Sequence, residues 1–217
     1  MGVNKIIPMG MFLMEFYMGK MDEKRNLKRK AILSAARETF LSDGYEGASM
    51  DHIAGAAEVT KQTVYRYFPS KEGLFKATLE EMGAESHADF LDHLDHANVR
   101  QAMIRFAEGF IQAHLSPDHI ATYRLLVSEG AKSPQMVQSF FEVGPDETHT
   151  RLRTFFQSRL KVSEPDLLIR LWTGMLLSPR GSVLIGNPAL QSHEIAEHAR
   201  VSTHLLVQSP LIGEIEL

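Results

Sequence analysis

Apolar residues recur along this chain at intervals of three and four, the spacing that places them on one face of an α-helix. In the segment 23–41, Ile32, Ala36 and Phe40 share such a face, and the residues Ser-Asp-Gly at 42–44 supply a stop signal directly after it. No β-branched run alternates long enough to make a convincing strand. The pattern therefore predicts an all-α chain of roughly nine or ten helices.

The remaining predicted helices are short near the N-terminus and longer beyond residue 98. Proline stands at or just inside four of the predicted helix starts, where its missing N–H costs nothing. The expected segments are a short helix after Ser49, a second from Thr60 through Tyr67, a longer one from Ser70 past Met82 into the acidic residues up to Asp95, and then 98–115, 118–129, 134–143, 146–160, 165–185 and 192–208, with a possible break at 178–181.

Residues 49–68 have the shape of a helix-turn-helix, because two short helices are separated by a turn of three or four residues. The small side chains of Ala54 and Ala57 let the two helices cross closely. The second helix is polar over most of its surface, with only Val64 and Phe68 clearly apolar, so it gains little from packing alone. Lysine and glutamine can bond base edges in a major groove, whereas threonine and tyrosine hold phosphates. The plain alternative is an αα-hairpin with a solvated face.

Charge is distributed unevenly along the chain. The formal net charge is -4, yet residues 20–76 hold 11 Lys and Arg against 8 Asp and Glu, and the rest of the chain holds 12 against 19. A basic N-terminal quarter on an acidic body is the asymmetry expected when one module meets phosphates and the other does not.

Ordered motifs over 28–75 resemble the DNA-binding domain of the TetR/AcrR family of bacterial transcriptional regulators. They are AILSAARETF, then G-Y-x-x-A-S, IA-x-x-A, VT-x-x-T-V-Y-x-Y-F and SKEGLF. The segment 123–145 looks like the AefR-type C-terminal ligand domain of some members. The resemblance implies a homodimeric transcriptional regulator, a repressor that a small organic effector releases from a palindromic double-stranded DNA operator in the cytoplasm.

The resemblance also implies roles for individual side chains near the turn. Residues matching Thr60, Tyr65 and Lys71 anchor phosphates in family members, and the one matching Ser49 often does so as well. Tyr67 matches a position that contacts the DNA backbone. The expected base-reading residues are Lys61, Gln62 and Thr63.

Two positions depart from the family pattern. Glu58 stands in the turn where the family usually has glycine, so it has to bear a positive φ that glycine tolerates, at a cost of about 1 kcal/mol. Gln62 replaces a commonly small residue and adds a side chain that can read a base.

The C-terminal half carries two apolar stripes to which we assign roles on the strength of the resemblance. An effector pocket is expected among Met103, Phe106, Phe110, Trp172 and Met175. The helices 165–185 and 192–208 are the expected dimer surface, on a stripe that an isolated monomer would expose: Leu168, Ile195, Ala199, Ser202 and Leu206.

Three parts are expected in all. Residues 1–20 form a disordered extension or follow a misassigned start codon, residues 21–70 form the helix-turn-helix domain, and residues 71–217 form the effector-binding and dimerisation domain. The first 19 residues have Pro8 and Glu15 inside the apolar part, which disfavours a signal peptide. No apolar run approaches the ~20 residues of a membrane helix.

The sequence gives little support for a catalytic or a metal-binding function. Cysteine is absent, and no G-x-S-x-G, P-loop or G-x-G-x-x-G motif occurs. His193 and His198 are five residues apart and so do not share a helix face, whereas His93 and His96 have a chelating spacing but lie in an acidic, solvated segment. We therefore expect no catalytic residue, no metal and no cofactor. Two alternatives stay open: an architectural DNA-binding protein without an effector, and a metal-dependent hydrolase.

Overall fold

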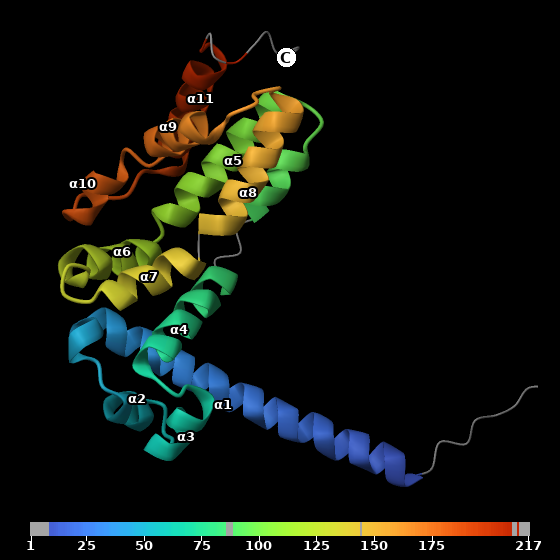
Figure 1. The fold of residues 1–217 in the computed structure, drawn as a ribbon, viewed down its shortest axis with the longest axis vertical. Helices are drawn as coiled ribbons and strands as arrows, with labels where there is room; N and C mark the ends of the chain where they lie inside the picture. Colours follow the sequence, from blue (N-terminus) through green and yellow to red (C-terminus); the bar gives the residue numbers. More distant parts are fainter. Residues whose placement is uncertain (1–8, 86–88, 144, 210–211, 213–217) are drawn as a thin grey trace, which may run out of the picture. The chain divides into compact units, whose positions relative to one another are not determined.

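The computed structural model describes residues 9–85, 89–143, 145–209 and 212 of the 217-residue chain (Figure 1). Within these ranges all regular secondary structure is helical, as the apolar spacing predicted. The chain divides into two compact units, residues 1–78 and 79–217, and the division falls inside a helix. No helix in the described part is long and apolar enough to cross a membrane.

The first unit contains α1 (Met9–Gly47), α2 (Met50–Ala56), α3 (Lys61–Tyr67) and the start of α4 (Lys71–Glu85). Gly44 has φ 79° and ψ 169°, so the regular part of α1 ends at the stop signal predicted there. The expected start of α1 at Glu23 is wrong, because the helix already begins at Met9. Pro8 precedes it, and no proline interrupts the helix after that. Residues 1–8 lie outside the described part.

The core of the first unit forms where α1 crosses the shorter helices. Ile32, Ile53 and Val64, from α1, α2 and α3, are completely buried. Phe40 and Phe75 meet edge to face with their ring centroids 5.1 Å apart, and Tyr45 contacts both rings. The aromatic contacts join α1 to the first turns of α4.

The second unit begins within α4 and contains the remaining elements. The helix predicted from Ser70 to Asp95 is two elements, because α4 ends at Glu85 and a separate 3-10 helix follows, with residues 86–88 outside the described part. The expected break at 178–181 separates α9 from α10. The elements are η1 (Asp89–Asp95), α5 (Val99–His114), α6 (Pro117–Glu129), α7 (Pro134–Val143), α8 (Pro145–Arg159), α9 (Asp166–Leu176), α10 (Arg180–Leu184) and α11 (Ser192–Val207).

Helix α5 lies at the centre of the second unit and packs against η1 on one side and α11 on another. The predicted pocket residues lie in this core. Met103, Phe106, Phe110 and Trp172 are buried, with the Phe106 ring 5.4 Å from Phe110 and 5.4 Å from Trp172, and Met175 packs partly buried at their edge. Their role toward an effector stays a prediction.

The predicted dimer stripe also lies in this core, so the expectation that a monomer would expose it is wrong. Its five members, Leu168, Ile195, Ala199, Ser202 and Leu206, are at most 7% exposed within the single chain. The apolar spacing of α11 was read correctly, but the stripe faces α5 of the same chain. A contact between two copies through α9 and α11 would have to use other faces of these helices.

Candidate nucleic-acid interface

Helices α2 and α3 are each held at their N-terminus by a side-chain cap. The Ser49 hydroxyl accepts a hydrogen bond from the backbone N–H of His52 at 3.1 Å, and the Thr60 hydroxyl accepts one from that of Thr63 at 3.2 Å. Both caps were predicted, and each satisfies an otherwise unpaired helix donor. Because capping uses an oxygen lone pair, the Ser49 O–H can still donate to a phosphate.

The turn between the helices has the hydrogen-bond pattern of a Schellman motif. The N–H of Val59 bonds to the carbonyl of Ala54 at 3.0 Å, and that of Glu58 bonds to the carbonyl of Gly55 at 3.1 Å. This motif requires a left-handed residue after the cap, and Glu58 has φ 54°. The positive φ expected at Glu58 is therefore confirmed, and a residue with a Cβ bears it at a cost of about 1 kcal/mol.

Helix α3 buries one side chain completely and exposes four others. Val64 is completely buried, whereas Lys61, Gln62, Tyr65 and Arg66 are exposed. The Lys61 ammonium lies 2.9 Å from the Asp51 carboxylate on α2, and this hydrogen bond raises the pKa of Lys61, so the side chain stays charged. An exposed ion pair of this kind is worth little, so Lys61 can exchange Asp51 for a nucleic-acid acceptor.

Two threonines at the start of α3 bond to each other. Their hydroxyl oxygens, on Thr60 and Thr63, are 2.9 Å apart. One of the two hydroxyl hydrogens remains available for an outside acceptor. Thr63 is partly buried, so it is less accessible to a base edge than its neighbours Lys61 and Gln62.

Two of the predicted phosphate contacts have partners inside the protein. The Tyr67 hydroxyl donates to the backbone carbonyl of Arg25 in α1 at 3.3 Å. The Lys71 ammonium is partly buried, donates to the carbonyls of Tyr45 at 2.9 Å and Ala48 at 3.4 Å, and lies 4.6 Å from the centre of the Tyr45 ring. These contacts give Lys71 a structural task at the end of α1.

Arg66 of α3 and the basic side chains of α1 were not among the residues predicted for the site. Arg66 is exposed on α3, with its guanidinium 5.7 Å from the ring centre of Tyr67. On α1 the run KRNLKRK at 24–30 places Arg25, Lys28 and Lys30 at exposed positions. That run was visible in the sequence as a charge excess, and its density was the signal that could have identified it.

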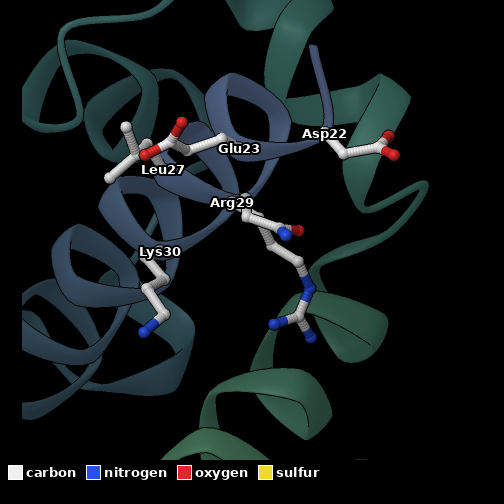
Figure 2. Close-up of a pocket in the computed structure, with 6 residues that line it drawn as sticks. Asp22, Glu23, Leu27, Arg29 and Lys30 are labelled. Atoms are coloured by element: carbon white, nitrogen blue, oxygen red, sulfur yellow. The ribbon is translucent and has the colours of Figure 1, made fainter. Parts of the chain in front are cut away.

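A hollow of about 520 Å³ lies beside this part of α1 (Figure 2). Its lining residues come from α1 alone and include acidic, basic and apolar side chains, which Figure 2 shows extending in different directions from successive turns. Side chains that do not converge give a small ligand no binding geometry. The residues that line the hollow are Asp22, Glu23, Asn26, Leu27, Arg29 and Lys30.

Two families of known sequences match separate parts of the chain. Residues 32–78 match bacterial regulatory proteins of the tetR family, and residues 101–167 match the C-terminal domain of AefR-like transcriptional repressors. The first match contains α2, the turn and α3 in full. The second begins in α5 and ends in α9.

Individual relatives agree with these matches. The HTH-type transcriptional regulator RutR of Escherichia coli K12 is 44% identical over 64 residues, which are 30% of this chain and 30% of RutR. The HTH-type transcriptional regulator UidR of the same strain is 25% identical over 193 residues, which are 84% of this chain and 91% of UidR. The chain thus matches under a third of RutR's length and most of UidR's.

Solved structures show the same fold. A tetR-family regulator from Mesorhizobium loti MAFF303099 superposes with a TM-score of 0.72 at 24% identity, covering 83% of this chain and 95% of that one. A structure described as the flavonoid-responsive regulator FrrA superposes with a TM-score of 0.70 at 25% identity, with the same coverage of both chains.

Proposed function

Because this chain belongs to the TetR family of bacterial regulatory proteins, we propose that it is a sequence-specific DNA-binding transcriptional regulator, a repressor. The observation that carries the proposal is helix α3. It is anchored by the buried Val64 and presents Lys61, Gln62, Tyr65 and Arg66 together on its exposed face. A helix with that surface, held by a turn against a second helix, suits the major groove.

The roles of the individual side chains follow from their chemistry and their exposure to solvent. Lys61 and Gln62 read base edges, since both are exposed at the start of α3 and carry groups that bond purines. Ser49, Thr60 and Tyr65 contact phosphates, together with the basic side chains of α1. Thr63 offers its hydroxyl to the DNA at the edge of the contact surface. Tyr67 and Lys71 act chiefly by positioning α1 against the helix-turn-helix.

A second copy of the chain is needed, because one short helix reads few base pairs and a two-fold dimer doubles the contact on a palindromic site. We place the dimer surface on the outer faces of α9 and α11, which contact each other. Each helix exposes an apolar pair at i, i+4 spacing there. The pairs are Leu167 with Leu171, 51% and 54% exposed, and Val201 with Leu205, 39% and 57% exposed.

A small organic effector releases the DNA in this proposal. The AefR-like match, residues 101–167, lies within the second unit, and the structural relative FrrA is described as responsive to flavonoids. Effector binding would favour a separation of the two α3 helices that no longer fits adjacent grooves. The helix α4 belongs to both units, so it is the covalent path for that change. The protein would act in the cytoplasm and catalyse no reaction.

Selection of DNA from a random pool by the purified protein tests the function. The expected product is a palindrome with half-sites that gel shift and footprinting confirm. Specific regulators bind their site about 10³-fold or more tighter than other DNA. Equal affinity for the selected site and for scrambled DNA would instead identify an architectural protein, and the absence of DNA binding would exclude both.

A further inference from the structure

A group of aromatic and cationic side chains lies in the second unit, on residues that belong to neither the proposed DNA surface nor the proposed dimer surface. It consists of His114 at the end of α5, His119 and Tyr123 on α6, Phe140 on α7 and Arg180 at the start of α10, and we refer to it as the His–Arg cluster. All five side chains are partly exposed, although they are large and come from four different helices.

The rings of the His–Arg cluster are in mutual contact. His114 and His119 are 4.7 Å apart between ring centroids, and Phe140 lies 6.2 Å from His119 and 6.4 Å from Tyr123. Two hydrogen bonds from Arg124 to the carbonyls of Val183 and Leu184 hold α6 against α10. Aromatic and cationic side chains from four helices therefore meet here, and α6 and α10 are joined beside them.

Arg180 brings a positive charge to these rings. Its guanidinium carbon lies 4.0 Å from the centre of the Tyr123 ring, and one N–H donates to the Tyr123 hydroxyl at 3.3 Å. No carboxylate of the described residues lies within ion-pair distance of Arg180, in contrast to Arg151, Arg153 and Arg200 of the same unit. A guanidinium has five N–H donors in a planar fork, so Arg180 retains donors suited to a carboxylate.

The two histidines are neutral hydrogen-bonding groups at neutral pH. Burial, as the larger cause, lowers the pKa of His114 to about 4 and that of His119 to about 3, and the charge of Arg180 contributes in both. The His114 Nδ1–H donates to the carbonyl of Phe110 at 2.8 Å, which fixes its tautomer. His119 shows no side-chain hydrogen bond in the described part, so its ring N–H can serve a ligand.

We propose that the His–Arg cluster binds an aromatic carboxylate, with the carboxylate on Arg180 and His119 and the ligand ring against Phe140 and Tyr123. This inference rests on the proposed function, because the ligand would be the effector. The cluster is continuous with the core, since Phe110 lies 4.0 Å from His114 and 5.4 Å from Phe106, which in turn contacts Trp172. Trp172 is the only tryptophan of the chain. Its fluorescence therefore reports on changes at the cluster.

Direct titration without DNA tests the inference on the full chain. Benzoate, 4-hydroxybenzoate and salicylate are titrated against Trp172 fluorescence and melting temperature, with benzamide as the uncharged analogue and cyclohexanecarboxylate as the non-planar one. At least one aromatic carboxylate is expected to bind about tenfold or more tighter than both analogues, the factor that one charge-assisted hydrogen bond supplies. Equal binding of benzamide, or no response to the aromatic acids up to about 10 mM, would overturn the inference.

Variants assign the binding to these residues. Arg180→Gln and His119→Phe are each expected to weaken the aromatic acid about tenfold, and Arg180→Lys should restore part of the loss because it restores the charge. Arg105→Gln on α5, which is exposed and lies outside the cluster, should bind as the wild type does. Unchanged binding in Arg180→Gln would place the ligand elsewhere and refute the assignment. If Arg180→Gln has an altered melting curve, unchanged binding in His119→Phe refutes it instead.

Failure here can be told apart from failure of the proposed function. A protein that binds its selected DNA but no aromatic acid would refute the ligand class and keep the regulator. A protein that binds the aromatic acid through Arg180 but no DNA would keep the site and refute the regulator.

Discussion

The Lys71 ammonium donates a hydrogen bond of 2.9 Å to the backbone carbonyl of Tyr45, where α1 ends, from the first position of α4. It lies over the ring of the same tyrosine, whose hydroxyl is buried without a partner among the described residues. A lysine predicted to meet phosphate thus stabilises the junction of two helices.

Replacing Lys71 should therefore lower the stability of the fold more than it changes DNA binding. Lys71→Met removes the hydrogen bonds to the α1 carbonyls, and we expect the free energy of unfolding to fall by about 1–3 kcal/mol. Urea denaturation measures it, with Lys132→Met, an exposed lysine of the second unit, as the control. A Lys71→Met variant with wild-type stability and a shallower salt dependence of DNA binding would return Lys71 to the phosphate role.

Glu58 offers a stabilising substitution. Glu58→Gly removes the Cβ from a residue with φ 54° and should raise the free energy of unfolding by up to about 1 kcal/mol. Glu58→Ala removes the carboxylate but keeps the Cβ, so it separates strain from charge. Thermal denaturation of both variants decides the matter. A larger gain in Glu58→Ala than in Glu58→Gly would point to charge as the cause.

Base reading is assigned to the start of α3. Lys61→Ala and Gln62→Ala should each weaken binding to the selected operator by about 1–3 kcal/mol and leave binding to scrambled DNA less affected. Gel shifts at two salt concentrations on both DNAs measure the difference, with Lys132→Ala as a control far along the chain. If both DNAs lost affinity equally, Lys61 and Gln62 would be phosphate contacts.

Substitutions can distinguish the proposed dimer surface on α9 and α11 from the buried stripe that the sequence had suggested for it. Leu171→Glu and Leu205→Glu put charges on exposed faces, so we expect folded monomers that lose operator affinity. Ile185→Glu, at a residue 83% exposed beside α10, should remain dimeric. Light scattering and thermal denaturation distinguish the results, and dimers that persist in both leucine variants would move the surface elsewhere.

Ala199→Arg should behave differently from the leucine variants. Ala199 is completely buried against the core of its own chain, so a bulky charge there is expected to unfold the second unit. Circular dichroism checks this directly. A stable, folded Ala199→Arg monomer would restore the stripe on α11 to the dimer surface.

Stability should fall in mild acid because of the two histidines of the His–Arg cluster. Their folded-state pKa values of about 4 and 3 lie below the ordinary 6.5, so the unfolded chain takes up protons first as the pH falls. Their contribution is complete above about pH 6.5 and is progressively lost toward pH 4 to 3. Denaturation at several pH values should show a shallower decline in His119→Phe than in His193→Phe, an exposed control on α11. Equal slopes would contradict the assignment.

The sequence by itself determined the helical class, the helix-turn-helix, its caps and the strained residue in its turn. These features are local, since a cap joins residues three apart and the Schellman turn is complete between Ala54 and Val59. Apolar spacing likewise located most helices, because periodicity and proline positions act within one element. The start of α1 was misjudged, since the segment before Glu23 is helical without an apolar stripe that announces it.

Only the tertiary structure decided which neighbour each face meets. The stripe on α11 has the spacing that either a core or a dimer surface would have, and its contact with α5 settled the question. Lys71 and Tyr67 find carbonyls on α1 that lie 26 and 42 residues away in sequence. The His–Arg cluster gathers side chains from residue 114 to residue 180, a set that no local spacing could bring together.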